Sequence, residues 1–160
     1  MSVNRLGVLT ACAVGLVLII AVVQASAAGS TQVLKLHLGN KTQAAVGFKI
    51  NSNAAPPVGS QYIITGALYN AAPQFGKPTG ARVGRVLLDC TFLSANSPNG
   101  DGTCSGIAHL PDGYFTFDGS GGFTNAKHGY YAITGGVGPY ANDRGQLRTG
   151  GGTAVATLSS

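Results

Sequence analysis

The chain has 160 residues, 25 of them glycine, and ten Lys and Arg against five acidic residues give it a net charge of +5. The basic residues are scattered and form no stripe with stacking aromatic residues, which argues against a nucleic-acid partner. Beyond residue 27, two cysteines and three dispersed histidines show no metal-ligand spacing, so no metal site is expected.

The first 27 residues have the pattern of a secretory signal peptide. Arg5 precedes the apolar run Leu6–Val23, and small residues ending at Ala27 fit a cleavage site. We therefore expect cleavage after Ala27, a secreted or cell-envelope protein, and no membrane attachment afterwards. Two alternatives remain open. The apolar run is nearly long enough for an uncleaved membrane anchor, and Cys12 ends a short sequence that resembles a lipoprotein box.

Residues 28–160 are expected to form a single domain made of β-strands. Short apolar runs alternate with turn sequences rich in Gly, Pro, Asn and Asp, and helical periodicity is absent after residue 30. This pattern is typical of an all-β sandwich or barrel. The expected strands are Val33–Leu38, Ala45–Ile50, Gln61–Tyr69, Arg82–Leu93, Thr103–Leu110, Tyr114–Asp118, Gly129–Thr134, Gly145–Arg148 and Thr153–Thr157.

Two of these strands carry Cys90 and Cys104 and are joined by the polar loop Ser94–Gly102, which predicts a hairpin. If the two cysteines lie opposite each other, large side chains meet small ones along one apolar face. A slip of one residue would put the cysteines on opposite faces. The register favours a disulfide, with two free buried thiols as the alternative. The facing pairs would be Leu88 with Gly106, Val86 with Ala108, and Gly84 with Leu110.

The other face of this hairpin is partly apolar too. It carries Val83, Leu87 and Ile107 beside Arg85 and His109. A sheet that is apolar on both faces is covered on both sides. We therefore expect a neighbouring subunit or a terminal segment to pack against the outside of the wall.

The stretch AITGGVGPYANDRGQL, residues 132–147, contains the letter pattern of a dinucleotide-binding loop at Gly136–Ala141. Such a loop needs a helix directly after the glycine turn. A proline and further glycines follow here, and no acidic residue lies at the distance that would hold a ribose. We interpret the stretch as a barrel corner, where glycines allow a sharp bend, and expect no cofactor.

The same stretch resembles the T-G-G-x-G-x-(Y/F) segment of the allene oxide cyclase and dirigent-type barrels. RVGRVLLDC resembles the cyclases' R-(I/V)-G-x-x-x-x-x-C, and VGSQYIITGALYN resembles their G-D-x-x-x-(F/Y)-x-x-x-L-Y. The likeness runs from about residue 31 to 150. It implies an eight-stranded antiparallel β-barrel with an apolar lumen for a small hydrophobic molecule. It also implies a homo-oligomer, a trimer or a dimer.

The resemblance carries several site residues onto this chain. Cys90 falls on a cysteine that lines the cyclase cavity, and Phe123 aligns with a cavity tyrosine but lacks the hydroxyl. His37 aligns loosely with a glutamate of the first strand, and Lys127 stands in place of an acidic residue. These three polar differences argue against allene oxide cyclase activity itself.

His37 is the one candidate catalytic residue, and it has two interpretations. Its alternation with Leu36 and Leu38 is typical of a solvent-side strand residue. In the lumen, by contrast, a histidine would be an acid or base tunable near neutrality.

Tyr62, Tyr114 and Asp118 could share the cysteine face. If PDG, residues 111–113, is a three-residue turn, Leu110 pairs with Tyr114, and Asp118 then reaches the same face. A bulge would reverse the assignment. Alternatively, both tyrosines are packing residues with their hydroxyls at the barrel rim.

The favoured hypothesis is an exported barrel that binds an apolar small molecule and guides its cyclisation or stereoselective coupling, as an isomerase or cyclase would. Holding a reactive conformer needs no conspicuous motif. The candidate ligand contacts are Cys90, Phe123, Tyr62 and Tyr114. The alternatives are a non-catalytic, lipocalin-like carrier and a structural cell-envelope barrel filled by its own side chains. A structure without a cavity of ligand size, roughly 300 Å³ or more, would favour the filled barrel.

Overall fold

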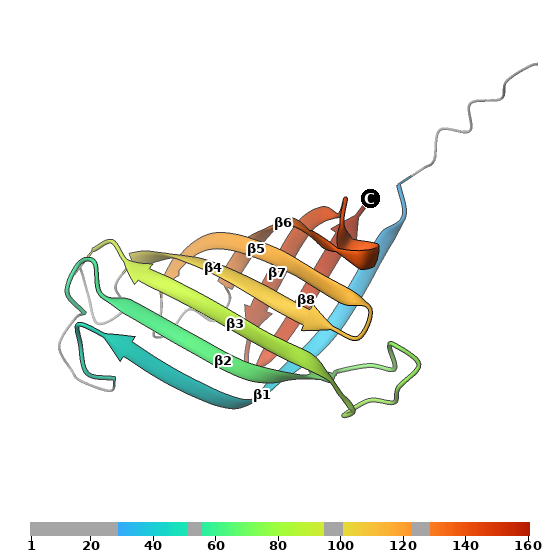
Figure 1. Ribbon diagram of the computed structural model, residues 1–160, viewed down its shortest axis with the longest axis horizontal. Coiled ribbons are helices and arrows are strands. Elements are labelled where there is room, and N and C mark those ends of the chain that lie inside the picture. Colours follow the sequence, from blue (N-terminus) through green and yellow to red (C-terminus); the bar gives the residue numbers. More distant parts are fainter. Residues whose placement is uncertain (1–28, 51–55, 95–100, 123–128) are drawn as a thin grey trace, which may run out of the picture.

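A computed structural model describes residues 29–50, 56–94, 101–122 and 129–160. These residues form a closed barrel in which each strand pairs antiparallel with the next and β8 returns to β1 (Figure 1). The predicted eight-stranded antiparallel barrel is confirmed. The expected signal peptide and Phe123 lie outside the described residues. The strands are β1 Thr31–Val46, β2 Gln61–Asn70, β3 Arg82–Phe92, β4 Asp101–Leu110, β5 Gly113–Gly122, β6 Gly129–Val137, β7 Arg144–Gly150 and β8 Thr153–Ser159.

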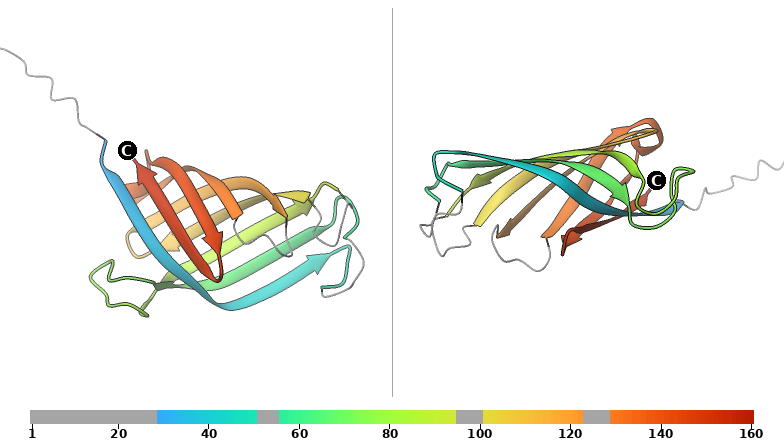
Figure 2. Two further views of the ribbon diagram at one scale, coloured as in Figure 1. Left: turned by 180° about the vertical axis from the view of Figure 1, so that it is seen from behind. Right: turned by 90° about the horizontal axis from the view of Figure 1, so that it is seen from below.

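The long strand β1 closes the barrel because it pairs with two different neighbours. Its first part, Thr31–His37, is hydrogen-bonded to β8, whereas its later part is hydrogen-bonded to β2. Figure 2 shows the blue start of β1 beside red β8 and its cyan end beside green β2. The register shifts between Gly39 and Thr42, and such irregularities increase the local twist of a strand. The irregularity allows β1 to bend, so that one strand can pair with β8 along its first part and with β2 along its later part.

The expected separate strand Ala45–Ile50 is therefore wrong. Its first two residues are the end of β1, which stops at Val46. The polar stretch around Lys41 was taken for a break between two strands. In the barrel Asn40 and Lys41 lie where the register shifts, and the exposed Thr42 and Gln43 pair with β2 again. An outer wall tolerates polar side chains without losing its hydrogen bonds.

The register of the β3–β4 hairpin agrees with the prediction. Cys90 lies opposite Cys104, Leu88 opposite Gly106, and a disulfide joins the two cysteines. The small residue at position 106 makes room for a neighbouring side chain, because a Cβ at Gly106 would overlap the ring of Phe117 on β5. The cysteine face is thus the inner face of the barrel.

The β4–β5 turn differs from the prediction by one residue. Pro111 and Asp112 form a two-residue turn, so His109 pairs with Tyr114. A shift of one residue moves every side chain of a strand to the other face. Phe115 and Phe117 therefore face the interior, and both are buried. Tyr114 and Asp118 do not lie on the cysteine face, contrary to expectation.

The glycine stretch after β6 makes a corner, as predicted. It continues as the 3-10 turn η1, Gly138–Tyr140, and not as an α-helix. Gly138 has a φ of +72°, and a Cβ there would overlap the carbonyl oxygen of Asp112. The buried Tyr140 hydroxyl donates a hydrogen bond to Oδ1 of Asp112 at 2.8 Å. The corner is thereby fastened to the β4–β5 turn.

Apolar side chains fill the end of the barrel that this corner covers. Leu110, Phe115 and Tyr140 belong to one buried cluster that includes residues from β1 and β8. The space left inside the barrel lies toward the opposite end.

Within the described ranges, no helix has the length and apolar character to cross a bilayer.

Candidate functional site

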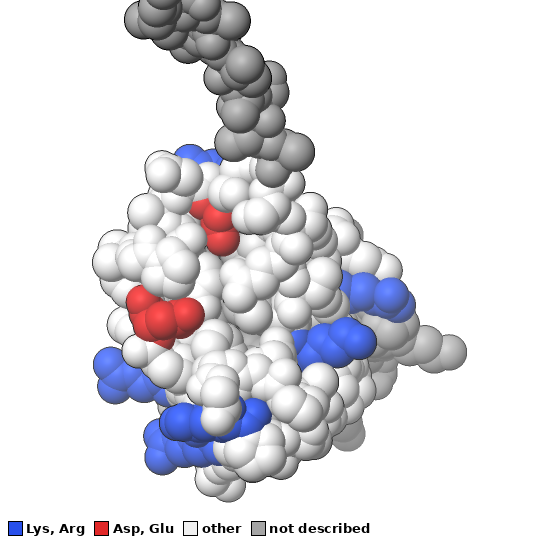
Figure 3. Space-filling model, turned by 90° about the vertical axis from the view of Figure 1, so that its right-hand side faces the viewer, with Lys and Arg blue, Asp and Glu red and all other residues white. Residues whose placement is uncertain are grey.

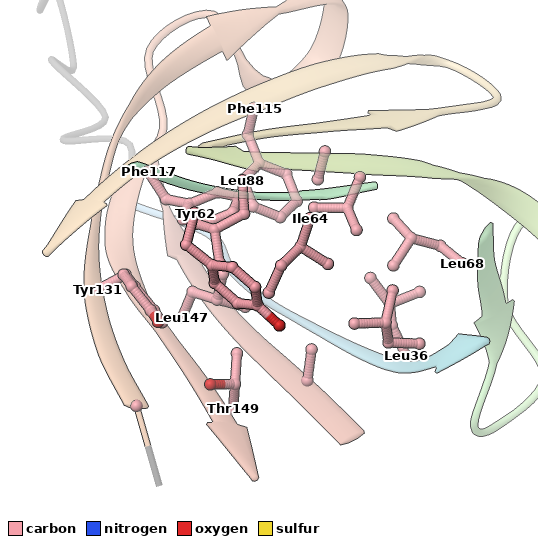
Figure 4. A pocket seen from close by; sticks show the side chains of 15 residues that line it. Leu36, Tyr62, Ile64, Leu68, Leu88, Phe115, Phe117, Tyr131, Leu147 and Thr149 are labelled. Atoms are coloured by element: carbon pink, nitrogen blue, oxygen red, sulfur yellow. The ribbon is translucent and has the colours of Figure 1, made fainter. Parts of the chain in front are cut away.

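The barrel encloses an apolar cavity of about 240 Å³ (Figure 4). Every strand except β4 and β8 contributes at least one bulky or polar side chain to its wall, and β4 and β8 each contribute one alanine. The lining residues are Leu36, Leu38, Tyr62, Ile64, Leu68, Val86, Leu88, Ala108, Phe115, Phe117, Gly129, Tyr131, Leu147, Thr149 and Ala154.

The volume limits what the cavity can hold. Pockets for drug-sized ligands start at roughly 300 Å³. An apolar cavity of roughly 150 Å³ accepts benzene. The cavity volume of about 240 Å³ lies between the two and suits a compound of one or two rings. The barrel is therefore neither completely filled nor wide enough for a large ligand.

Hydroxyl groups are confined to one end of the cavity, which we call the polar end. Among the described lining residues, polar side chains belong to Tyr62, Tyr131 and Thr149 alone. Tyr62 lies at the start of β2, Tyr131 near the start of β6 and Thr149 near the end of β7. In an antiparallel barrel these three strand ends meet at the same rim. Leucine and phenylalanine side chains surround the remainder of the space.

Tyr131 is held by three neighbours. Its ring makes an edge-on contact with Phe117, with ring centroids 5.5 Å apart. Burial raises the pKa of Tyr131, and a side-chain hydrogen bond with Thr149 partly lowers it again. A Cβ at Gly129 would lie 2.8 Å from the Thr149 hydroxyl and 3.1 Å from the Tyr131 hydroxyl. Glycine at this position therefore leaves the room that the two hydroxyls occupy.

Tyr62 faces the same space from β2. Its ring centroid lies 6.2 Å from that of Phe48, and burial raises the pKa of its hydroxyl. Both lining tyrosines are therefore protonated at neutral pH and can donate hydrogen bonds. Figure 4 shows the Tyr62 oxygen among the lining side chains and the Thr149 oxygen on the side of Tyr131.

The structure separates the residues expected at the site. Tyr62 lines the cavity as expected. Cys90 is fully buried on the inner face, but its sulfur is in the disulfide, and it is not among the lining residues. His37 is exposed between the inward-facing Leu36 and Leu38, which corresponds to the solvent-side interpretation.

Tyr114 lies outside the cavity. It is on the outer face, where its ring centroid is 5.5 Å from that of His109. Phe123 falls outside the described residues. Of the four expected ligand contacts, the structure thus places one in the cavity wall.

Several lining residues were missed from the sequence. Tyr131 was hidden in the pair Tyr130–Tyr131, although alternation with Ile133 marks it as the inward-facing member. Phe117 was assigned to the wrong face because the preceding turn was predicted one residue too long. Thr149 had no signal, since nothing in a lone threonine near a strand end indicates a cavity.

Charged groups are sparse around the molecule. Figure 3 shows Lys and Arg in separate places on a face that is mostly uncharged. Across the four described ranges, no three His, Cys, Asp or Glu side chains come together in a group that could hold a metal ion.

Comparison by sequence finds no matching family model and no matching curated protein. Comparison of structures finds barrels of the same fold. A pyocyanin demethylase superposes with a TM-score of 0.59 at 26% identity, over 81% of this chain and 99% of its own. A pterocarpan synthase dirigent protein gives 0.55 at 14% identity, over 82% of this chain and 87% of its own.

A nonspecific heme-binding cyclase that catalyses a cycloaddition in neoabyssomicin biosynthesis gives a TM-score of 0.53 at 13% identity. The match covers 82% of this chain and 65% of the cyclase. These neighbours include dirigent proteins and a cyclase, so the fold is that of the dirigent and allene oxide cyclase-like barrels. The resemblance expected from the sequence is confirmed at the level of the fold.

Proposed function

We propose that the protein binds a small, largely apolar ring compound inside the barrel and guides its conversion, as a cyclase or isomerase does. The observation that carries the proposal is the closed barrel with an apolar cavity of about 240 Å³ and hydroxyls at one end only. The three neighbours support it, because their names describe proteins that act on or bind small molecules.

The cavity suits catalysis by positioning. Its walls are strands tied to two neighbours each, so a bound molecule meets a fixed shape. Holding reacting atoms in one geometry removes much of the entropic part of a barrier. Tyr62 and Tyr131 add hydrogen-bond donors at the polar end, where they can stabilise negative charge that develops on an oxygen.

A non-catalytic carrier is the second candidate, and one observation favours it. Among the described lining residues, none has a side chain that titrates near neutral pH. A protein that only retains its ligand needs no such group. General acid–base catalysis, in contrast, works best with a group whose pKa lies near the working pH.

The binding site is tested by filling the cavity. Ala154 lines the cavity from β8, and Ala154→Leu places three more carbons in the space. We expect naphthalene, measured by its fluorescence, to bind the variant roughly tenfold more weakly or worse, equivalent to about 1.4 kcal/mol. The matched control is Ala132→Leu, on the exposed face of β6. Equal binding by wild type and Ala154→Leu would overturn the cavity as the site.

Turnover separates a catalyst from a carrier. Native mass spectrometry of the purified protein identifies any retained compound, and that compound and pyocyanin are then incubated with the protein. Consumption by wild type but not by Ala154→Leu indicates catalysis in the cavity. Retention of the compound without chemical change indicates a carrier.

We also propose that the chain is exported and forms a homo-oligomer. The signal-like sequence up to Ala27 supports export, and so does the Cys90–Cys104 disulfide, because such bonds persist in oxidising compartments. The outward-facing Leu87, which is 43% exposed, supports association through the outer wall.

A further inference from the structure

We propose that Tyr131 is the hydrogen-bond donor that recognises the ligand, that Thr149 and Gly129 position it, and that the ligand is an uncharged ring compound with a carbonyl-type acceptor at its polar end. This inference rests on the proposed binding function and specifies its ligand class.

The first step is the charge of the cavity. The lining residues within the described chain include no Asp, Glu, His, Lys or Arg. A charged ligand buried there would be without a counter-ion, and burying an unpaired charge is strongly unfavourable. The ligand is therefore uncharged in the cavity.

The second step is the direction in which the ligand lies. The far end is lined by Leu68, Phe115 and Ala108, which offer no polar partner. A polar atom placed there would lose its hydrogen bonds to water without replacement. The ring system consequently occupies the apolar end, and its polar atom lies at the polar end.

The third step is the role of the Tyr131–Thr149 pair. Hydroxyls that bond to each other share one proton between their oxygens, and the second proton remains available. When Thr149 donates to the Tyr131 oxygen, the Tyr131 proton is free for a ligand acceptor, and the two bonds strengthen each other. The tyrosine stays protonated because burial raises its pKa. A ligand with an acceptor oxygen is thus favoured over one without.

Gly129 makes this arrangement possible. A methyl group there would lie 2.8 Å from the Thr149 hydroxyl and would press on the Tyr131 ring, whose Cε2 atom is 3.0 Å away. Phe117 holds the other side of the ring. The Tyr131 ring is therefore held in one position, between Phe117 and the residues Gly129 and Thr149.

The test uses two probes of the same shape, α-tetralone and tetralin, which differ by the carbonyl oxygen. Calorimetric titration of the wild type should show α-tetralone binding about three- to tenfold more tightly than tetralin. Tyr131→Phe should remove this preference by weakening α-tetralone binding to the level of tetralin. Thr149→Val should reduce the preference about twofold. The matched control is Tyr130→Phe, the same change one residue away on the exposed face.

A spectroscopic readout distinguishes recognition from a structural role. The carbonyl stretch of bound α-tetralone should lie at lower frequency in wild type and Tyr130→Phe than in Tyr131→Phe. If wild type binds both probes equally, the assignment of Tyr131 is overturned while the binding function stands. If neither probe binds, the proposed function fails for this ligand class and the inference fails with it.

Discussion

Tyr140 connects two turns that are distant in the sequence. Its buried hydroxyl donates to Asp112, and its ring packs edge-on against Phe115 with centroids 5.9 Å apart. Burial, the hydrogen bond to Asp112 and the negative charges of Asp112 and Asp143 all raise the pKa of the hydroxyl. Ionisation of Tyr140 in the folded barrel is therefore strongly opposed.

This raised pKa predicts an alkaline loss of stability. A group whose pKa is higher in the folded state stabilises the fold fully below its unfolded-state pKa, about 10 for tyrosine, and progressively less above it. At pH 8, Tyr140→Phe should lower the free energy of unfolding by about 1 kcal/mol through the lost hydrogen bond. Urea unfolding at pH 8 and about pH 11 should show the difference between the two proteins shrinking. A difference that stays constant would contradict the pKa assignment.

At the residue scale, the sequence is informative where neighbours impose a pattern. Tyr62 was proposed as a ligand contact because it could share the face of Cys90, and it lines the cavity. Tyr131 was not recognised because two adjacent tyrosines look equivalent until the strand pairing decides which one faces inward. Gly129 could not be assigned a role from the sequence, since its importance depends on the Thr149 and Tyr131 side chains that occupy the space where its own side chain would be.

The disulfide is the main covalent element of the barrel wall. It links the last part of β3 to the first part of β4 across a separation of 14 residues. Closing a loop of that size stabilises a fold by about 3 kcal/mol in the chain-entropy model. We expect dithiothreitol to lower the urea midpoint of the wild type. The double variant Cys90→Ala, Cys104→Ala should unfold at the reduced midpoint with or without reductant. Insensitivity of the wild type to reductant would contradict a formed disulfide.

Strand elements were predictable because short apolar runs alternate with turn sequences, whereas the connections were less predictable. Cross-strand complementarity around Cys90 and Cys104 selected the correct register of one hairpin. The Pro111–Asp112 turn offered no such check, and an error of one residue there changed the face of a whole strand. The length of β1 was also missed, because its polar middle is paired although it is exposed.

At the scale of the whole molecule, the outer wall offers a place for another copy. Leu87 lies opposite Ile107 in a shallow hollow of β2, β3 and β4, rimmed by Arg85 and His109. Light scattering of the wild type should give a mass above that of one chain. Leu87→Asp should give the monomer, because it would bury an unpaired charge in the interface. Val46→Asp, at an exposed apolar residue near the end of β1, is the control. A wild-type monomer would contradict association through this wall.

The overall barrel could be predicted from the resemblance, which implied eight strands although the strand pattern alone gave nine, but its cavity could not be predicted. A sequence pattern shows which side chains point inward without showing how completely they fill the space. Here the space depends on Phe115 packing against Tyr140 of the corner, and on small residues such as Ala154 at the other end.

The seam between β1 and β8 has a consequence for how the chain matures. Thr31 pairs with Ser159, so the barrel can close only after the last strand, β8, has paired with the first part of β1. Contacts between such distant positions form slowly. Until then, β1 presents an unpaired edge to which another chain can add. For the exported chain proposed above, closing this seam removes the free edge of β1 and so protects the chain from aggregation.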